Sequence, residues 1–338
     1  VIVNRGINIG CKQWYIMTSP MNHEETVNYF KGKNWFGLTS DSFFFFQQGV
    51  LPTLTSLPPP NKTYPSIHLS SKNRISFAPD GNGGVYVSLI KSGALADMEK
   101  KNVKFIHAFS VDNMLVLPCD PTFVGFCIGG SADCGNKVLW KRDHSEKVGV
   151  MCSDETSGRP NVIEYSDMDE DMKKMTIDGK EGSKLAYGAG NICNHFYSYE
   201  FLKTVSEKCI HGGIPYHVAS KKIPFVNCST GEEEVDNKGM KLESFIFDVF
   251  PESTNMKVLE VERNSEFAPV KNCDVANQIV EDSPTMGRNM LTALCRQKLL
   301  HKGELLLNGE EFNALKEKVL AFKEVEICPT IWWGAGDQ

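Results

Sequence analysis

The sequence lacks most of the features that assign a function at first sight. No apolar run approaches the roughly 20 residues of a membrane span, and the longest aromatic run, Phe43 to Phe46, has four residues. The patterns GxxxxGK[ST], HExxH and GxSxG are absent, which argues against P-loop, zincin and α/β-hydrolase sites. No dense block of Lys and Arg occurs, and the formal net charge is −6. We therefore expect neither a nucleic acid nor a membrane as a partner.

Cysteine patterns typical of metal sites are also missing. The 11 cysteines form no CxxC pair, and Cys119, Cys127 and Cys134 are not spaced like zinc ligands. No basic region followed by a long apolar run marks a signal peptide at the N-terminus. Because unpaired thiols persist in reducing compartments, we predict free cysteines and a cytoplasmic location.

The remaining composition is that of a globular protein. The chain has 338 residues, of which 41% are hydrophobic and 23% are charged, which suits about two domains. Apolar runs at 14–17, 43–46 and 103–111 predict buried strands, each followed by small polar residues. Between them, helices are predicted over 23–32, after Asn22 as N-cap, and from Gly83 to Ile90. This alternation indicates an α/β fold with a mostly parallel sheet and a ligand crevice beyond its strand ends.

Later segments extend this pattern. Strands are predicted at 147–152, 161–165 and 185–193, and a helix at 198–209. A further helix is predicted at 241–250, because apolar residues recur there at helical spacing, namely Leu242, Phe245, Ile246, Val249 and Phe250. Ser283 and Pro284 form a favourable N-cap and N1 pair for a helix that runs through Leu300.

Three of these segments could carry chemistry. Gly81, Asn82 and two further glycines form a loop before a helix, where free N–H groups can approach a ligand, although a purely structural turn is equally compatible. Asp112 ends an apolar strand and could either hold Mg²⁺ together with phosphate oxygens or cap the next helix. Glu164 and Tyr165 end another strand and could accept hydrogen bonds from a sugar hydroxyl or merely provide an edge charge.

Isolated residues give weaker indications. Lys241 and Lys271 lie beside apolar segments and could neutralise phosphate, or be solvated lysines. Phe247 falls off the apolar face of its predicted helix and could line a pocket. His107 and His195 lie within apolar runs and are predicted to be core histidines. The residues alone therefore indicate an α/β protein with an anion- or nucleotide-binding crevice, without naming a reaction.

Taken in order, the segments resemble the eukaryotic UDP-N-acetylhexosamine (UDP-N-acetylglucosamine) pyrophosphorylases. The resemblance is collinear from about residue 13 to residue 300. Its clearest stretches are Trp14-Tyr-Ile-Met-Thr-Ser19, Phe45-Phe-Gln-Gln-Gly49, Ala78-Pro-Asp-Gly-Asn-Gly-Gly84, Val111-Asp-Asn113, Gly190-Asn-Ile-Cys-Asn-His-Phe196, Phe245-Ile-Phe-Asp-Val-Phe250 and Glu266-Phe-Ala-Pro-Val-Lys-Asn272.

The resemblance implies a fold and a reaction. Residues 1–272 would form a nucleotidyltransferase core, Rossmann-like and GT-A-like, and 273–338 the start of a smaller C-terminal domain. Such enzymes join UTP and N-acetylglucosamine 1-phosphate into UDP-N-acetylglucosamine and pyrophosphate, using Mg²⁺. Because the sugar phosphate is already ionised and acts as the nucleophile, no general base is needed, and positioned charges supply the catalysis.

The resemblance also implies roles for individual residues. Gln48 and the Gly81 backbone would contact uracil, and Asn82 the sugar side. Asp112 would hold the metal near the phosphates, with Lys241 facing the UTP phosphates and Lys271 the sugar phosphate. The hexosamine would be held by Gly149, Glu164, Tyr165, Asn191 and, on its N-acetyl side, Phe247.

Departures from the family pattern qualify this reading. Family members carry a glycine-rich loop and a Pro-Lys-Gly lysine upstream of the strand at Trp14, where this sequence has only 13 residues without either element, and Val1 stands first. We therefore expect this chain to be incomplete and to turn over weakly or not at all. A short non-catalytic paralogue that binds uridine nucleotides or a partner, and a UDP-glucose or broad UDP-sugar pyrophosphorylase, are the alternatives.

Overall fold

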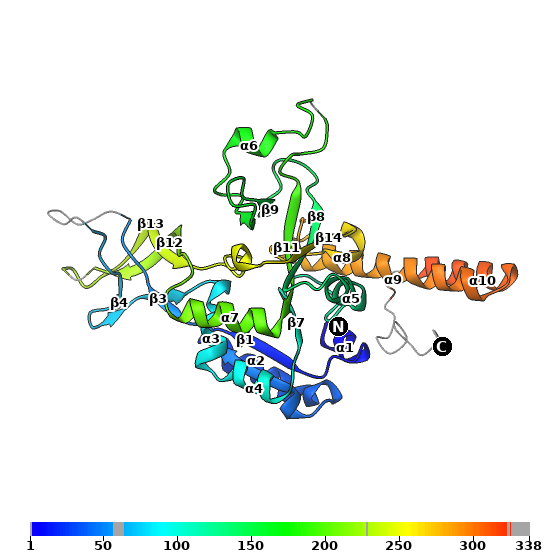
Figure 1. The fold of residues 1–338 in the computed structure, drawn as a ribbon, viewed down its shortest axis with the longest axis horizontal. Coiled ribbons are helices and arrows are strands. Elements are labelled where there is room, and N and C mark those ends of the chain that lie inside the picture. The colour runs from blue at the N-terminus through cyan, green and yellow to red at the C-terminus, as the bar shows by residue number, and fades with distance from the viewer. Residues whose placement is uncertain (1, 57–63, 181, 228, 323–324, 326–338) are drawn as a thin grey trace.

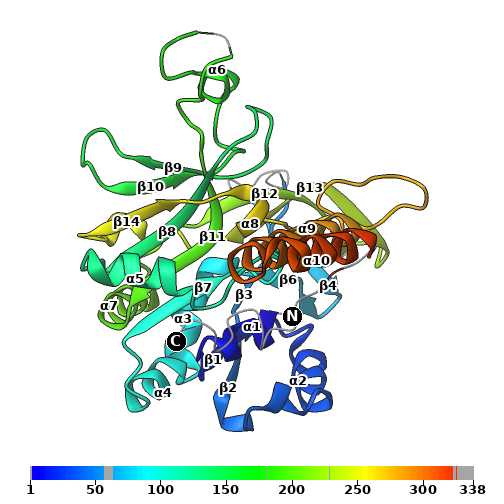
Figure 2. The ribbon, with the colours of Figure 1, turned by 90° about the vertical axis from the view of Figure 1, so that its right-hand side faces the viewer.

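A six-stranded mixed sheet forms the centre of the protein (Figures 1 and 2). The computed structural model describes residues 2–56, 64–180, 182–227, 229–322 and 325. The sheet has the order β10 (Pro160–Ile163), β9 (Val150–Ser153), β11 (Ala189–Ser198), β8 (Cys134–Trp140) and β14 (Met256–Glu260), and β7 (Phe105–Phe109) also pairs with β11.

The α/β class is confirmed, but the sheet is less parallel than predicted. Within the central sheet only β14 and β8 pair in parallel, whereas β11 pairs antiparallel with β7, β8 and β9. A second parallel pair, β1 (Trp14–Thr18) with β2 (Phe43–Gln47), forms a sheet of its own. The central sheet is therefore mixed, because all its neighbouring strands except β14 and β8 run in opposite directions.

Most predicted strands and helices occur where the sequence placed them. The first three predicted strands are β1, β2 and β7, and the next three are β9, β10 and β11 with shifted bounds. The helices at 23–32, 83–90 and 198–209 are α2 (His23–Gly32), α3 (Val85–Lys91) and α7 (Tyr199–Ile210). Other helices are α1 (Ile2–Asn8), α4 (Ala94–Lys100), α5 (Pro121–Gly129), α6 (Glu170–Lys174) and α8 (Arg263–Glu266).

The main core lies between the sheet and the helices α3 and α7. It contains Tyr86, Leu89, Leu202, Val205 and Phe250, all less than 4% exposed. Ser198 caps α7 by accepting a hydrogen bond from the Phe201 amide at 3.2 Å. Burial of a Leu or Phe side chain stabilises the fold by about 1.5–3 kcal/mol, so this cluster fixes both helices beneath the sheet.

The helix predicted at 241–250 is wrong. Lys241 to Glu243 are the end of β13 (Glu233–Glu243), which pairs antiparallel with β12 (His217–Val226). Residues 244–245 are irregular and 246–249 form turns, followed by a short 3₁₀ turn from Phe250 to Glu252. The apolar spacing predicted burial only in part: Ile246, Val249 and Phe250 are buried, but so is Phe247, which is off the predicted face, and Phe245 is only half-buried. A loop inserted into the core buries these side chains. Apolar residues at helical spacing do not distinguish such a loop from a helix.

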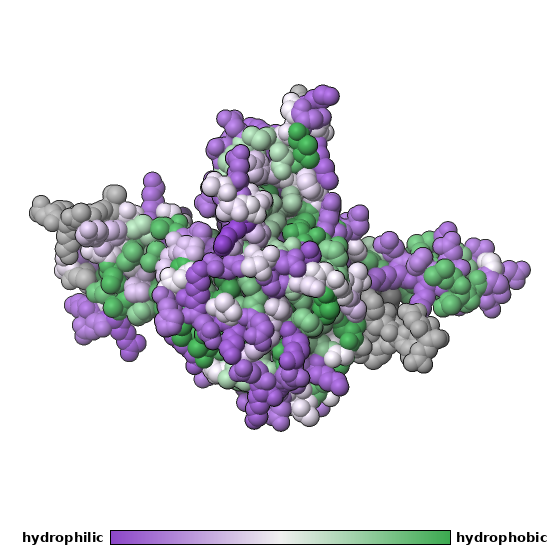
Figure 3. Space-filling model, in the orientation of Figure 1, coloured by the Kyte–Doolittle hydropathy of each residue, from purple (hydrophilic) through white to green (hydrophobic). Residues whose placement is uncertain are grey.

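The β12–β13 hairpin forms a lobe with several short strands. These are β3 (Val50–Pro52), β4 (Leu69–Ser71), β5 (Arg74–Ile75) and β6 (Phe77–Pro79). Figure 1 shows this lobe on the left, and the excursion that carries α6 above the sheet. In Figure 3 hydrophilic residues dominate the same face, and apolar residues surface in patches over the hairpin lobe, on the central body and at the far end of the last two helices.

The last two helices are α9 (Pro284–Leu306) and α10 (Gly309–Ala321), which pack against each other. The predicted Ser283 cap is confirmed: its Oγ accepts from the Met286 amide at 3.3 Å, with Pro284 at the first position. Leu291, Leu294 and Cys295 of α9 pack on Leu115 and Ala268. Division of the chain at residue 272 stays a prediction, and residues 326–338 lie outside the described part.

Two further expectations concern cysteines and membranes. The nine described cysteines are all free thiols. In the described part of the chain, no helix has the length and apolarity needed to cross a bilayer. His195 is fully buried and His107 is partly so, and both lie among aromatic rings, so their assignment to the core is confirmed.

Candidate active site

The segments carrying Asp112 and Lys271 lie side by side. Asp112 follows β7, and its carbonyl oxygen accepts a hydrogen bond from the Val270 amide at 3.0 Å. Asn113 and Pro269 form a β-bridge, and the Met114 amide donates to Ala268 at 3.0 Å. A carboxylate and an ammonium group that are 159 positions apart are thus borne on adjacent, hydrogen-bonded backbones.

Asn113 holds this pairing in place from inside the protein. Its side chain is 2% exposed, accepts from the Leu115 and Ala268 amides at 3.1 and 2.9 Å, and donates to the Glu266 carbonyl at 2.8 Å. An amide oxygen has two lone pairs and is fully used here. Asn113 was read from sequence only as part of a motif, yet it connects both chemistry-bearing segments.

A buried ion cluster holds the segment that begins at Glu266. Lys137 is completely buried in β8, and its Nζ lies 2.6 Å from Asp120 Oδ2 and 2.9 Å from Glu266 Oε2. Buried charges are tolerated when paired in this way. Glu266 leads into the stretch that pairs with Asp112 and Asn113, so the cluster ties that stretch to the central sheet.

Gly149, Glu164 and Asn191 converge at the ends of β9, β10 and β11. The Asn191 amide donates to the Gly149 carbonyl at 2.8 Å. A Cβ on Gly149 would lie 3.0 Å from Val162 Cγ1 and 3.4 Å from Glu164 Oε1, so any side chain would crowd the carboxylate. Burial raises the pKa of Glu164, and the positive charges of His217 and Lys271 partly oppose that shift. Lys271 therefore lies within electrostatic range of Glu164, one of the predicted sugar-binding residues.

A break in the β8–β11 pairing joins this corner to Asp112. The register shifts between Asn191 and His195, and Cys193 takes a positive φ of 51°. Asn191 Oδ1 accepts from the Cys193 amide at 3.2 Å, and the Cys193 carbonyl accepts from Ser110 at 3.2 Å. Burial raises the pKa of the Cys193 thiol to about 12, assisted by the nearby charge of Asp112. Asn191 and Asp112 therefore border the same corner.

The predicted uracil contacts form a second corner. The Gln48 amide donates to Thr18 at the end of β1 at 2.8 Å, and the Gly49 carbonyl accepts from the Asp80 amide at 3.2 Å. A Cβ on Gly49 would lie 2.4 Å from Asp80 Oδ2. Such close approach brings the loop after β2 against the loop that begins with Gly81.

Gly81 and Asn82 are also bound to the loop after β13. Gly81 has φ +90°, and a Cβ there would lie 2.3 Å from the Ser244 carbonyl oxygen. The Ser244 amide donates to the Asp80 carbonyl at 2.8 Å, and the Ile246 amide to Asn82 Oδ1 at 2.9 Å. One polar atom of Asn82 is therefore used within the protein, holding the segment that contains Phe247.

Phe247 and its neighbour Phe245 form an aromatic wall on this loop. Phe247 is 6% exposed, and its ring stacks on Phe245 at a centroid distance of 5.1 Å. The half-buried Phe245 ring packs in turn against His217 at 4.6 Å. Phe247 thus packs largely in the core, and the part of the wall nearer to solvent is Phe245 with His217.

Sequence reasoning missed the pairing of His217 with Asp248. His217 Nε2 lies 2.9 Å from Asp248 Oδ1, and burial raises the pKa of Asp248. These residues are 31 positions apart on β12 and on the loop after β13. The Phe-Asp sequence at 247–248 carried no local sign of a histidine partner.

The remaining predicted residues are less closely joined to these corners. Tyr165 follows Glu164 and is 38% exposed. Lys241 is half-buried in β13 opposite Ala219. Within the described residues, no hydrogen bond or ion pair links Lys241 to Asp112 or Lys271, so the structure does not bring the three predicted catalytic residues together by direct contact.

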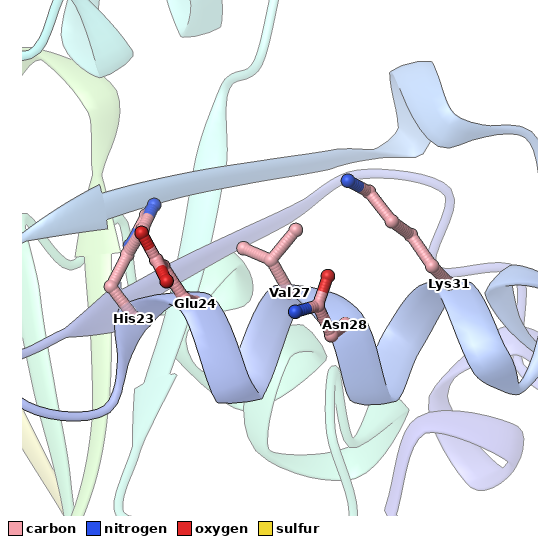
Figure 4. Close-up of a pocket in the computed structure, with 5 residues that line it drawn as sticks. All are labelled: His23, Glu24, Val27, Asn28 and Lys31. Carbon is pink, nitrogen blue, oxygen red and sulfur yellow. The ribbon is translucent and has the colours of Figure 1, made fainter.

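Two cavities lie away from these corners. Figure 4 shows a shallow one of about 240 Å³ along α2, lined by His23, Glu24, Val27, Asn28 and Lys31. A second, of about 450 Å³, is lined by residues of α1, α5, β14, α8 and α9. Neither contains a predicted site residue. Among the described residues there is also no group of three His, Cys, Asp or Glu side chains able to hold a metal ion.

We therefore consider Asp112 by itself as a candidate metal ligand. Its half-buried carboxylate forms no hydrogen bond or ion pair with any described residue. Mg²⁺ typically takes one or two protein carboxylates and completes its shell with substrate phosphates and water. The residues present fit such a substrate-assisted Mg²⁺ site, and they do not fit a site built from protein ligands only.

Comparison with known proteins agrees with this geometry. A family model described as UTP–glucose-1-phosphate uridylyltransferase matches residues 7–327. The chain belongs to this family. Among curated relatives, a probable UDP-N-acetylglucosamine pyrophosphorylase of Dictyostelium discoideum is 43% identical over 274 residues, which are 80% of this chain and 54% of the relative. UDP-N-acetylglucosamine diphosphorylase 2 of Arabidopsis thaliana is 38% identical over 88% of this chain and 55% of its own.

Solved structures of this family share the fold. The putative UDP-N-acetylglucosamine pyrophosphorylase of Entamoeba histolytica matches with a TM-score of 0.72 and 32% identity, over 86% of this chain and 68% of its own. The Trypanosoma brucei enzyme, solved with an inhibitor, gives a TM-score of 0.79 and 27% identity, over 95% and 62%. The resemblance predicted from sequence is therefore confirmed, and the chain spans about half the length of the curated relatives it matches.

Proposed function

We propose that this protein is a uridylyltransferase that forms UDP-N-acetylglucosamine and pyrophosphate from UTP and N-acetylglucosamine 1-phosphate. One observation supports this most strongly: the Asp112 and Lys271 segments are paired beside a corner built from Gly149, Glu164 and Asn191. In that arrangement the carboxylate that we propose as a Mg²⁺ ligand and a cation lie next to polar groups suited to a sugar. The names of the relatives point to the same substrates.

The chemistry requires positioning rather than proton transfer. A phosphate oxygen of the sugar phosphate forms a bond to the α-phosphorus of UTP, while the bond to the β-phosphate oxygen breaks and pyrophosphate leaves. Lys271 would neutralise the sugar phosphate, and Lys241 the UTP phosphates. Fixed charges of this kind stabilise the charge that spreads over the transferring group.

We further propose Mg²⁺ as the cofactor, held by Asp112 together with substrate phosphates. When bound, the ion would neutralise phosphate charge and align the reacting oxygens. The protein would contribute the carboxylate and hold it through the Val270 and Asn113 pairings. The Asp112→Asn variant should keep the fold, yet lose the dependence of nucleotide affinity on Mg²⁺.

On the substrate side, Gln48 and Gly81 would recognise uracil through the loops that meet at Asp80. Asn82, Gly149, Glu164, Tyr165 and Asn191 would hold the sugar, with Phe247 behind its N-acetyl side. These assignments, the cytoplasmic location and the reduced turnover expected for this chain stay predictions.

The decisive experiment measures pyrophosphorolysis and binding together. The protein is incubated with pyrophosphate, Mg²⁺ and either UDP-N-acetylglucosamine or UDP-glucose, and UTP is quantified, while calorimetry gives the affinity for each sugar nucleotide. UTP formed preferentially from UDP-N-acetylglucosamine supports the proposal. Preference for UDP-glucose would favour the UDP-sugar alternative. Nucleotide affinity without UTP formation would identify a non-catalytic binder, and no affinity for either compound would overturn the proposal.

A further inference from the structure

Asp248 joins the imidazole of His217 to the backbone amide of Phe245 through one buried carboxylate. Its Oδ1 lies 2.9 Å from His217 Nε2, and its Oδ2 accepts a hydrogen bond from the Phe245 amide at 2.7 Å. The Asp248 side chain is 5% exposed, whereas the His217 side chain is 34% exposed. Because the buried carboxylate has both oxygens occupied, the imidazole and the Phe245 backbone are fixed relative to each other.

The imidazole is the outermost member of a row of three rings. His217 packs on Phe245 at 4.6 Å with an interplanar angle of 36°, and Phe245 stacks on Phe247 at 5.1 Å and 26°. Phe247 at the inner end is 6% exposed. A ligand approaching the aromatic wall from solvent therefore meets His217 before it meets Phe247.

His217 also lies within electrostatic range of Glu164, one of the predicted sugar contacts. The charges of His217 and Lys271 both lower the pKa of Glu164 against the upward effect of burial, which places both near that carboxylate. In β12, His217 is paired with Glu243, the last residue of β13 before the loop that holds Ser244 against Asp80. The imidazole thus packs on the aromatic wall and lies within electrostatic range of Glu164.

We propose that His217 contacts the hexosamine of the bound sugar nucleotide, and that Asp248 is the residue that positions it. With Nε2 engaged by Asp248, Nδ1 is the ring nitrogen left to pair with a hydroxyl or amide of the ligand. The ligand class is a 2-acylamino sugar. The aromatic wall of Phe245 and Phe247 suits the apolar acyl group, and the neighbouring polar side chains suit the polar groups of the sugar. This inference rests on the proposed function and adds a contact that the sequence did not predict.

The purely structural alternative is that the pair only fastens β12 to the loop after β13. A bond of that kind would affect stability and leave ligand preference unchanged. The two roles therefore separate in binding experiments that compare UDP with UDP-N-acetylglucosamine, since only the second compound carries the sugar.

Calorimetric titration with UDP and with UDP-N-acetylglucosamine tests the proposal. His217→Phe keeps a ring on Phe245 and removes both nitrogens. It should weaken binding of UDP-N-acetylglucosamine about tenfold, the effect of one lost hydrogen bond with its unpaired partner, and leave UDP unchanged. Asp248→Asn, which weakens the hold on the imidazole, should lower the same affinity by a smaller factor. His211→Phe, at the exposed end of α7, is the matched control and should change neither affinity.

A second measurement needs no variant that might misfold. In histidine side-chain ¹⁵N spectra of the unaltered protein, one imidazole should shift with UDP-N-acetylglucosamine and not with UDP. Equal affinities of the His217→Phe variant and the unaltered protein for UDP-N-acetylglucosamine, or equal spectra with both ligands, would overturn the role of His217 while leaving the proposed function standing. Absence of any affinity of the unaltered protein for UDP-N-acetylglucosamine would overturn both.

Discussion

The carbonyl oxygen of Asp112 accepts a hydrogen bond of 3.0 Å from the amide of Val270, the residue before Lys271. This single backbone contact sets the predicted metal ligand beside a predicted phosphate ligand. Asn113 stabilises this contact, because its buried side chain forms hydrogen bonds with three backbone groups of the two paired segments.

Replacing Asn113 should therefore damage both stability and the site. Asn113→Ala leaves two buried amides and one carbonyl without partners, so we expect the free energy of unfolding to fall by about 2–4 kcal/mol. Urea denaturation measures this loss. Asn272→Ala removes the exposed bond to the Glu281 carbonyl and should cost less than about 1 kcal/mol. Equal effects of the two substitutions would contradict the assigned role of Asn113.

The buried ion cluster should behave differently from ion pairs at the surface. Lys137→Met leaves the Asp120 and Glu266 carboxylates without their cation, and we expect a loss of about 3–5 kcal/mol. Adding Glu266→Gln should recover part of it, because one uncompensated charge disappears. Lys203→Met, which breaks the exposed pair with Glu99, should cost under about 1 kcal/mol. Chemical denaturation in parallel distinguishes the three variants.

Gly81 should tolerate no side chain. Gly81→Ala would bring a Cβ within 2.3 Å of the Ser244 carbonyl at a φ of +90°, so the loop must shift away from Ser244. We expect uridine nucleotide affinity to fall at least about tenfold, or 1.4 kcal/mol, with a lower melting temperature. Gly125→Ala, within α5, meets no atom within 4 Å. That control should be neutral or stabilising by up to about 1 kcal/mol, and a harmless Gly81→Ala would refute the close packing.

Acid should destabilise the protein through its buried histidines. Burial lowers the pKa of His195 to about 3 and of His107 to about 4. The unfolded chain binds protons at these sites near pH 6.5, whereas the folded chain does not. The free energy of unfolding is therefore fully retained above pH 6.5 and falls as the pH drops below it, by up to about 1.4 kcal/mol per pH unit for each histidine.

Urea denaturation at pH 7.5, 6.5 and 5.5 measures this slope before most carboxylates titrate. His195→Gln should reduce the slope by the share of one histidine. His301→Gln, on the exposed side of α9, should leave it unchanged. An unaltered slope in His195→Gln would mean that His195 takes up its proton in the folded state.

The sequence predicted where strands and helices occur better than it predicted which of them lie side by side in the fold. Asp112 was correctly placed at the end of a strand, but its pairing with the Lys271 segment depends on contacts between residues 158 positions apart. Only tertiary structure decides which strand ends meet. The resemblance to a family supplied the relation between these residues, which local patterns did not.

The failed helix at 241–250 has a related physical cause. Apolar spacing reports which side chains are buried, and it does not report the backbone that buries them. Here Lys241 to Glu243 belong to a strand that pairs with β12. Asp80 and Asn82 accept the hydrogen bonds that hold the residues after it. The pairing of His217 with Asp248 also depends on tertiary contacts, so local sequence patterns did not predict it.

The loop of residues 244–248 has a consequence for how ligands are taken up. Its first residues are fastened to Asp80 and Asn82 at the uracil corner, and its last residue holds His217 at the sugar corner. Because both ends are already held by hydrogen bonds within the protein, neither substrate has to order this loop on binding, and the affinity for each gains from that preorganisation.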